Sequence, residues 1–521
     1  MTNPEQRAAS PSSRIPAFHP VVLAAAFVIQ AAVSNGLGPA SFARPLLVAT
    51  LAALAVLALL WLVLRNQAVA ALFATALLLL VASHDPVIDV LTAARAAWGA
   101  AGAVVVIGAA MFLPLAAIVV GVDQFRRGHL GPPITRSATA GLNVFSVALL
   151  VVVLLQGAGS VSGWLQAPGG RAAAIPPAGS DAQPDIYLFL LDGYSRADEL
   201  QRQFGIDNSA FLTELEFRGF DVDEASRTNY TYTALTLTAM LSMDYIPVAD
   251  SHVVSELDLR GHLHMEMRSG PAVTALRDAG YELVATAPGW EQVSIRPGAD
   301  RYLDRPELND FEMALLRRTW LPDVPPIPAD LFFDSLRARI SGVLDDAASV
   351  AAETRSRPTF TFVHVPAPHL PIAFGRDGEP TRYSSRQYLA GRASEFGLSD
   401  EGYTLAYAAS LSYLNARMIE TVEAIQAASA RPPVIVIMSD HGYNGDSPVH
   451  TEAMLHNLFA AHTPQHPRLL ESVTPVNLLR VLLETYAGAH LGQPVADRFF
   501  TTVISGGVGA YDLALTEVVD P

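Results

Sequence analysis

The chain has 521 residues, of which 51% are hydrophobic and only 16% are charged, a balance too apolar for an ordinary soluble protein of this size. It contains no cysteine, which excludes disulfides, thiolate metal ligands, a cysteine nucleophile and a formylglycine made from cysteine. All 34 cationic side chains are arginine, so Schiff-base chemistry and P-loop phosphate binding are excluded as well.

Charge divides the chain into two parts. Residues 1–180 contain nine arginines and four acidic residues, whereas residues 181–521 contain 25 arginines and 46 acidic residues. We expect a transmembrane anchor at 1–165, a flexible Gly/Ala/Pro-rich linker at 166–184 and an extracytoplasmic catalytic domain at 185–521. The acidic balance of that domain argues against nucleic acid as its partner.

The first part has five charge-free stretches, each able to contain the roughly 20 apolar residues that cross a bilayer. They are Ile15–Ala43, Pro45–Leu64, Asn66–His84, Ala96–Val122 and Ser137–Gly170. With the N-terminus inside, the cytoplasmic segments carry six arginines against three outside, so the positive-inside rule places the large domain outside the cytoplasm. A cleaved signal peptide ending at Ala43 is a rival interpretation, with the same placement of that domain.

These stretches have no Asp, Glu or Arg in their interiors, which favours an anchor in the cell membrane over a transporter. Presentation of a lipid substrate by the bundle is a further possibility.

Beyond residue 185, short apolar runs alternate with amphipathic stretches, which is typical of an α/β domain with a mostly parallel sheet. Buried strands are expected at Ile186–Leu191, Tyr281–Thr286, Thr359–His364 and Val434–Met438. Helices are expected at Ala210–Phe217, Ala272–Ala279, Ala329–Leu344, Tyr403–Ala428 and Thr474–Tyr486. Ligands of such sheets bind at the carboxyl ends of the strands, so the polar residues there are the candidates for function.

Three strand ends carry such residues. Asp192 follows the first strand, where an Asp-Gly pair can also simply form a turn. Asp440 and His441 follow the last strand, where together they can bind one divalent cation or, alternatively, cap a helix and form local hydrogen bonds. His364 and His369 flank a proline-rich loop that suits an anionic group or a second metal, or else simple packing.

Thr233 opens a helix whose apolar residues recur at helical spacing. A threonine there can act as the N-cap of the helix. A helix N-terminus also favours a phosphate or sulfate, and a metal-bound hydroxyl at this position is a plausible nucleophile.

Taken in order, Asp192-Gly, Asn229-Tyr-Thr-x-Thr233, His364-x4-His369-x-Pro and Ser-Asp440-His441-Gly resemble the alkaline phosphatase superfamily in its sulfatase-like branch. With the N-terminal spans, the chain is most similar to membrane-anchored enzymes of the lipoteichoic acid synthase and phosphoethanolamine transferase type. The resemblance covers roughly residues 185–500.

This resemblance implies one divalent metal, Zn or Mn, held by Asp192, Thr233, Asp440 and His441, with Thr233 as the nucleophile. It also implies that His369, Asn229 and His364 contact the transferred group or the substrate. A second metal stays open, with His450 and His456 as candidate ligands. The transferases usually have Glu in place of Asp192, and Thr233-Ala-Leu-Thr-Leu replaces the Cys/Ser-x-Pro-x-Arg motif from which sulfatases make formylglycine.

We therefore expect a membrane-anchored, metal-dependent phosphotransferase or phosphodiesterase. Its partners would be the lipid bilayer and a lipid-linked or glycan phosphodiester of the cell envelope. The Arg-only, Ala-rich composition suggests a bacterial source. The alternatives are a sulfatase-like ester hydrolase of unknown substrate and a non-catalytic envelope protein that retains the fold.

Overall fold

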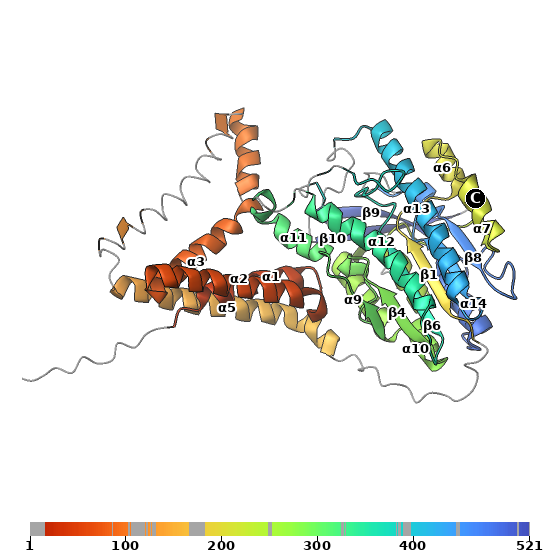
Figure 1. Cartoon of the computed structure of the whole chain (residues 1–521), viewed down its shortest axis with the longest axis horizontal. Coiled ribbons are helices and arrows are strands. Elements are labelled where there is room, and N and C mark those ends of the chain that lie inside the picture. The colour runs from red at the N-terminus through yellow and green to blue at the C-terminus, as the bar shows by residue number, and fades with distance from the viewer. Residues whose placement is uncertain are drawn as a thin grey trace, which may run out of the picture. The chain divides into compact units, whose positions relative to one another are not determined.

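The structure is a computed structural model (Figure 1). It describes residues 16–85, 87–99, 101–102, 105, 120, 123–124, 127, 132–165, 183–247, 253–324, 328, 330–381, 383, 387–388, 397–443, 449–507 and 510–519. The chain forms two compact units. A helical unit comprises Met1–Val161 with Leu315–Pro325, and an α/β unit comprises Ser162–Ala314 with Pro326–Pro521. All but the last two residues of the expected linker at 166–184 lie outside the described residues.

The helical unit contains α1 (His19–Ser34), α2 (Pro39–Leu64), α3 (Gln67–Val81) and α5 (Pro132–Leu165). Two of its described helices, α2 and the Pro133–Gly157 part of α5, are long and apolar enough to cross a membrane. The other two have only 16 and 15 residues, fewer than the roughly 20 that a span needs. Most of the expected fourth stretch, Ala96–Val122, lies outside the described residues, so the five-span bundle stays a prediction.

This unit exposes many large apolar side chains and buries several polar ones. Val63 on α2 and Leu155 on α5 are 71% and 70% exposed. One face of α5 instead carries a buried polar stripe of Thr135, Thr139, Asn143 and Ser146. Such an arrangement is the reverse of a water-soluble helix bundle, in which polar side chains face the solvent.

A hydrogen-bond network joins this stripe to the neighbouring helices. Asn143 Oδ1 on α5 accepts hydrogen bonds from the backbone N–H groups of Phe18 and His19, at 3.3 and 3.1 Å, and so caps the start of α1. His19 Nδ1 lies 2.7 Å from Thr75 Oγ1 on α3. Three helices therefore share one buried polar seam.

The α/β unit is built on a seven-stranded sheet of order β2-β8-β7-β1-β6-β4-β5. Its strands are β1 (Ile186–Leu191), β2 (Asp221–Val222), β4 (Glu282–Thr286), β5 (Arg301–Leu303), β6 (Thr359–Val365), β7 (Val434–Ser439) and β8 (Phe459–His462). The five strands from β7 to β5 run parallel, while β8 and β2 add antiparallel pairs at one edge. The four predicted strands and the mostly parallel sheet are confirmed.

Helices cover both faces of this sheet. The helices of this unit are α6 (Ala197–Phe204), α7 (Ser209–Phe217), α8 (Thr233–Ser242), α9 (Glu256–Ser269), α10 (Pro271–Asp278), α12 (Leu331–Ala351), α13 (Asp400–Ala428) and α14 (Pro475–Tyr486), with short 3-10 turns at Glu291–Val293 and Glu452–Leu455. The helix α11 (Asp310–Arg317) begins in this unit and ends in the helical unit, which also contains the 3-10 turn Leu321–Asp323. Alternate β1 residues Ile186, Leu188 and Leu190 share a core with α8, α9, α10 and α14. On the opposite face α12 packs on β6 and against α13 (Figure 1).

A second, three-stranded antiparallel sheet of order β3-β10-β9 has no counterpart in the sequence predictions. It consists of β3 (Val253–Ser255), β9 (Phe499–Gly507) and β10 (Ala510–Val518). Isolated bridges join β9 to Tyr230 and Val449. This small sheet therefore holds the segments that lead into α8 and into His450.

Candidate active site

The candidate residues meet because β1 lies between β7 and β6 in the sheet. Leu191 pairs with Ser439 on β7, and Leu190 pairs with His364 on β6. The three parallel strands therefore end at one edge, as the sequence predicts. Asp192 follows β1 and Asp440 follows β7, so the two carboxylates become neighbours across 248 positions of sequence.

Asp192, Asp440 and His441 form a buried cluster whose ligand atoms all lie within 4.8 Å of one another. Asp440 Oδ1 accepts hydrogen bonds from the N–H groups of Gly193 and His441, at 3.1 and 2.9 Å. Asp440 Oδ2 and Asp192 Oδ1 are buried and have no hydrogen-bond partner among the described residues.

His441 completes this donor set. Its Nδ1 lies 2.7 Å from the Gly442 carbonyl, which retains the proton on Nδ1 and leaves the Nε2 lone pair for a ligand. Nε2 lies 3.4 Å from Asp440 Oδ2. Two buried carboxylates with vacant oxygens beside a free imidazole nitrogen fit a divalent cation.

Thr233 is the first residue of α8 and is half-buried. The alternative that Thr233 only caps the helix does not hold, because Tyr232 occupies the cap position and makes no side-chain cap bond. The Thr233 side chain instead approaches the cluster, with Oγ1 at 3.5 Å from His441 Nε2. The hydroxyl therefore lies beside the carboxylates and at the N–H end of a helix, where negative charge is stabilised.

Two of the residues expected to contact the substrate, His364 and Asn229, are fully buried in this structure, and their contact with a substrate stays a prediction. His364 is fully buried behind Asp192, with Nε2 at 3.2 Å from Asp192 Oδ2, so it supports that carboxylate. Asn229 is also fully buried, and its amide is used within the protein. Its Nδ2 donates to the Tyr245 hydroxyl and the Arg498 carbonyl, and its Oδ1 accepts from the N–H of Val476 at the start of α14.

His369 does lie at the cluster. Its backbone N–H donates to the Asp192 carbonyl at 3.0 Å, and its ring centroid lies 6.4 Å from that of His441. The His369 Nδ1 donates to the Leu370 carbonyl at 2.6 Å, which leaves Nε2 for a substrate. The rings of Trp290 and His369 pack edge to face, with 5.2 Å between their centroids. Trp290 follows β4, a position that signals no contact with His369 in the sequence.

The two histidines considered as ligands of a second metal, His450 and His456, lie in different places. His450 is buried with its ring 6.5 Å from that of His441; Nδ1 lies 3.2 Å from Thr231 Oγ1, and Nε2 has no hydrogen-bond partner in the described structure. His456 instead pairs with Glu199 at 2.8 Å. His456 and Glu199 form a separate group with Asp198, in which both acids belong to α6.

Neighbouring charges shift the pKa values of Asp192 and His441. Burial acts to raise the pKa of Asp192, but the charges of His369 and His441 and the hydrogen bond from His364 outweigh it and lower the pKa to about 2. Burial acts to lower the pKa of His441, yet Asp440 and Asp192 raise it above its ordinary value. The histidines thus favour the ionised form of Asp192, and the two carboxylates favour the protonated form of His441.

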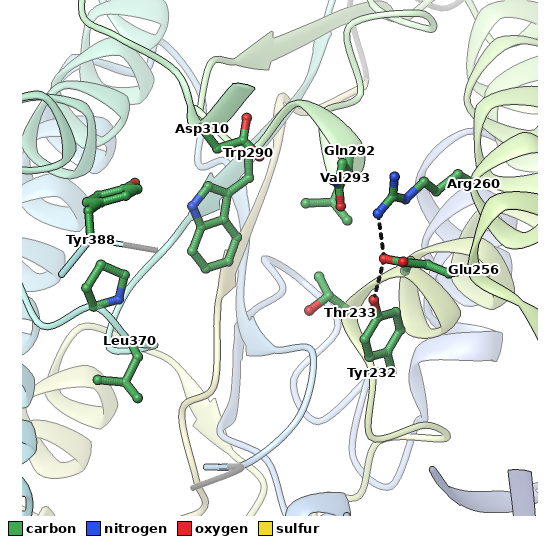
Figure 2. Close-up of a pocket in the computed structure, with 12 residues that line it drawn as sticks. Tyr232, Thr233, Glu256, Arg260, Trp290, Gln292, Val293, Asp310, Leu370 and Tyr388 are labelled. Atoms are coloured by element: carbon green, nitrogen blue, oxygen red, sulfur yellow. Dashed lines mark hydrogen bonds and ion pairs between the residues drawn. The ribbon is translucent and has the colours of Figure 1, made fainter. Parts of the chain in front are cut away.

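A pocket of about 290 Å³ opens beside Thr233 (Figure 2). Residues of its lining include Tyr232, Glu256, Arg260, Trp290, Asp310 and Tyr388. These residues are absent from the sequence predictions, because they come from separate elements that only the fold brings together.

A sulfatase family model matches residues 204–467, just over half of the chain. The chain therefore belongs to the sulfatase family, which confirms the resemblance to the sulfatase-like branch of the alkaline phosphatase superfamily. The matched range contains Thr233, Asp440 and His441, whereas Asp192 precedes it. No curated protein matches the chain in sequence.

Similar solved structures include both transferases and sulfatases. Lipooligosaccharide phosphoethanolamine transferase A from Neisseria meningitidis, an integral membrane protein, is 12% identical, with 74% of this chain and 69% of that chain covered and a TM-score of 0.38. The C-terminal periplasmic domain of EptC from Escherichia coli is 15% identical, with coverages of 60% and 86% and a TM-score of 0.37. BT1596, a 2-O GAG sulfatase, is 14% identical, with coverages of 60% and 72% and a TM-score of 0.35.

Proposed function

We propose that this sulfatase-family protein is a membrane-anchored, metal-dependent phosphotransferase or phosphodiesterase with Thr233 as its nucleophile. Its substrates are phosphodiesters of lipid-linked or envelope molecules. The observation that carries the proposal is the approach of Thr233 Oγ1 to within 3.5 Å of His441 Nε2, beside two buried carboxylate oxygens without hydrogen-bond partners in the described structure. A threonine at this position favours phosphoryl transfer, because it cannot become formylglycine.

Asp192, Asp440, His441 and Thr233 would hold one divalent cation. Zn or Mn suits this mixture of carboxylate, imidazole and hydroxyl ligands. When bound, such an ion lowers the pKa of a coordinated hydroxyl and neutralises charge on the group under attack. His364 would keep Asp192 in orientation through its 3.2 Å contact, the usual task of residues behind metal ligands.

The reaction would proceed in two displacements. In the first, the Thr233 oxygen forms a bond to phosphorus, the ester P–O bond breaks, and the leaving alcohol carries away the proton that Thr233 gives up. In the second, water or an acceptor hydroxyl attacks phosphorus, the Thr233–phosphorus bond breaks, and the acceptor's proton restores the Thr233 hydroxyl. His369 Nε2 would hold the transferred group, since its Nδ1 is engaged by a carbonyl.

The same proposal places α2 and α5 across the cell membrane and the α/β domain, from residue 185 onward, outside the cytoplasm. The exposed apolar surface of both helices and the buried polar stripe of α5 support insertion into lipid. A domain tethered in this way can reach substrates in or near the outer leaflet.

Variants at Thr233 test the chemistry on purified full-length protein. With an aryl phosphodiester, Thr233→Ala should lose nearly all activity, Thr233→Ser should retain part of it, and phosphate label should be recovered on Thr233 of the wild type. Ser242→Ala, at the other end of α8, serves as the control. Full activity of Thr233→Ala would refute the nucleophile, and faster turnover of an aryl sulfate than of the phosphodiester would favour the sulfatase alternative.

Because the chain has no cysteine, single engineered cysteines test the topology directly. Asp258→Cys on α9 should react with a membrane-impermeant maleimide in intact cells. Arg65→Cys, in the turn between α2 and α3, should react only after the cells are opened. The reverse labelling pattern would overturn the proposed orientation.

A further inference from the structure

The pocket beside Thr233 has two chemically different walls (Figure 2). Trp290, Tyr388 and Leu370 line one side of the opening, and Tyr232 with Glu256 and Arg260 lines the other. Thr233 lies at the border between them. A group attached to phosphorus that is under attack by Thr233 can therefore enter this space, which at about 290 Å³ suits a small head group.

Charges on the second wall cancel. Arg260 Nη2 donates to Glu256 Oε1 at 2.6 Å, and the side chains of both are only 6% exposed. The Tyr232 hydroxyl donates to the same oxygen at 2.9 Å. Glu256 and Arg260 thus neutralise each other, and this oxygen already accepts two hydrogen bonds.

A second carboxyl group at the pocket is only partly compensated, because the charge of Arg339 lowers the pKa of Asp310 by less than burial raises it. Asp310 lines the pocket, and the backbone N–H groups of Glu291 and Phe311 donate to its Oδ1. Burial, and then the charge of Glu291, raise the pKa of Asp310 to about 7. Arg296 lies 3.8 Å from Glu291 and offsets part of that charge. Two neighbouring acids at a partly enclosed aromatic pocket create a negative potential that a cation would relieve.

We propose that this pocket binds a quaternary ammonium group carried by the phosphodiester, so that the substrate head group is of the phosphocholine class. The inference rests on the proposed function and names its substrate. Faces of Trp, Tyr and Phe attract such cations without hydrogen bonds, and desolvation strengthens the attraction. A quaternary ammonium needs no acceptor, so it suits a site in which Glu256 Oε1 and Asp310 Oδ1 each already accept two hydrogen bonds, and comparison with a primary amine tests this preference.

The test compares three substrates with the full-length protein in detergent. They are para-nitrophenyl phosphocholine, its carbon isostere with a tert-butyl group in place of trimethylammonium, and the primary-amine analogue. We expect kcat/KM for the phosphocholine ester to exceed that of the isostere by about ten-fold and also to exceed that of the amine. The ratio of kcat/KM between the phosphocholine ester and its isostere is then measured in three variants. It should fall in Asp310→Asn and Tyr388→Leu. It should stay unchanged in Asp258→Asn, which removes an exposed acid from α9.

The outcomes separate the two proposals. Equal turnover of all three esters, or preference for the isostere or the amine, overturns the quaternary ammonium site and leaves the phosphodiesterase intact. Turnover of none of them counts against the proposed reaction. Calorimetric titration of wild-type protein with phosphocholine then tests the quaternary ammonium site independently of turnover. Binding supports the site, and the absence of binding refutes it.

Discussion

His441 Nε2 lies 3.5 Å from Thr233 Oγ1, although 208 positions of sequence separate the two residues. The first follows a central strand of the sheet and the second opens a helix packed against that sheet. Their approach turns two ordinary features, a strand end and a helix start, into one candidate site. Several consequences of this arrangement can be measured.

Removal of a ligand should remove the metal. Asp440→Asn and His441→Ala each take one donor from the buried cluster and should lower the bound divalent metal to well below one equivalent in purified full-length protein. Elemental analysis by mass spectrometry measures this, and Asp258→Asn is the matched exposed control. Full metal occupancy in both variants would show that the cluster is not the metal site.

His364 should affect metal binding through its contact with Asp192. Because its Nε2 contacts Asp192 Oδ2 at 3.2 Å and the ring is fully buried, His364→Gln should weaken metal affinity by roughly 10–100-fold. The amide of His364→Gln can still donate a hydrogen bond, so His364→Leu should be more severe. Competition with a metal chelator measures the affinity, and addition of excess metal should restore turnover. An unchanged affinity would limit His364 to packing.

Asp310 should make the stability of the protein depend on pH. Its folded pKa of about 7 lies above the ordinary value of 3.8, so its contribution to stability is fully present below pH 3.8 and is lost as the pH rises through 7. Asp310→Asn should therefore gain melting temperature relative to the wild type between pH 4 and pH 8, by a few degrees. Because Asp310 also faces the pocket, water screens part of the effect. Thermal melts in detergent measure it, and a difference that does not vary with pH would contradict it.

Asn143 should stabilise the helical unit by linking α5 to the start of α1. Its side chain caps α1 from α5, so Asn143→Leu should destabilise this unit by about 1–2 kcal/mol, the usual contribution of a helix cap. Phe145→Leu, which alters a side chain 57% exposed on the same helix, should have little effect. Proteolysis of the detergent-solubilised protein measures the difference. Equal resistance of the two variants to proteolysis would show that the Asn143 cap does not stabilise the unit.

The sequence determined the strands best. β1 coincides with its predicted range and β4, β6 and β7 differ from theirs by a residue at one end, because buried parallel strands are short, continuous apolar runs that carry their own boundaries. The strand-end positions of Asp192, Asp440 and His441 followed from the same pattern. In contrast, β9 and β10 were missed, since their mixed polar sequence depends on pairing with each other for its structure.

The sequence by itself thus determined the acidic α/β domain, its mostly parallel sheet, its sulfatase-like motifs and the polar residues at the strand ends, since these are properties of local composition and periodicity. Only the tertiary structure decided which of those residues meet. It brought Thr233 and His441 together and turned Asn229 inward. It also placed His364 behind Asp192 and assembled the pocket of Trp290, Glu256 and Asp310. Contacts between distant elements depend on the order of strands and the packing of helices on them, which local sequence does not encode.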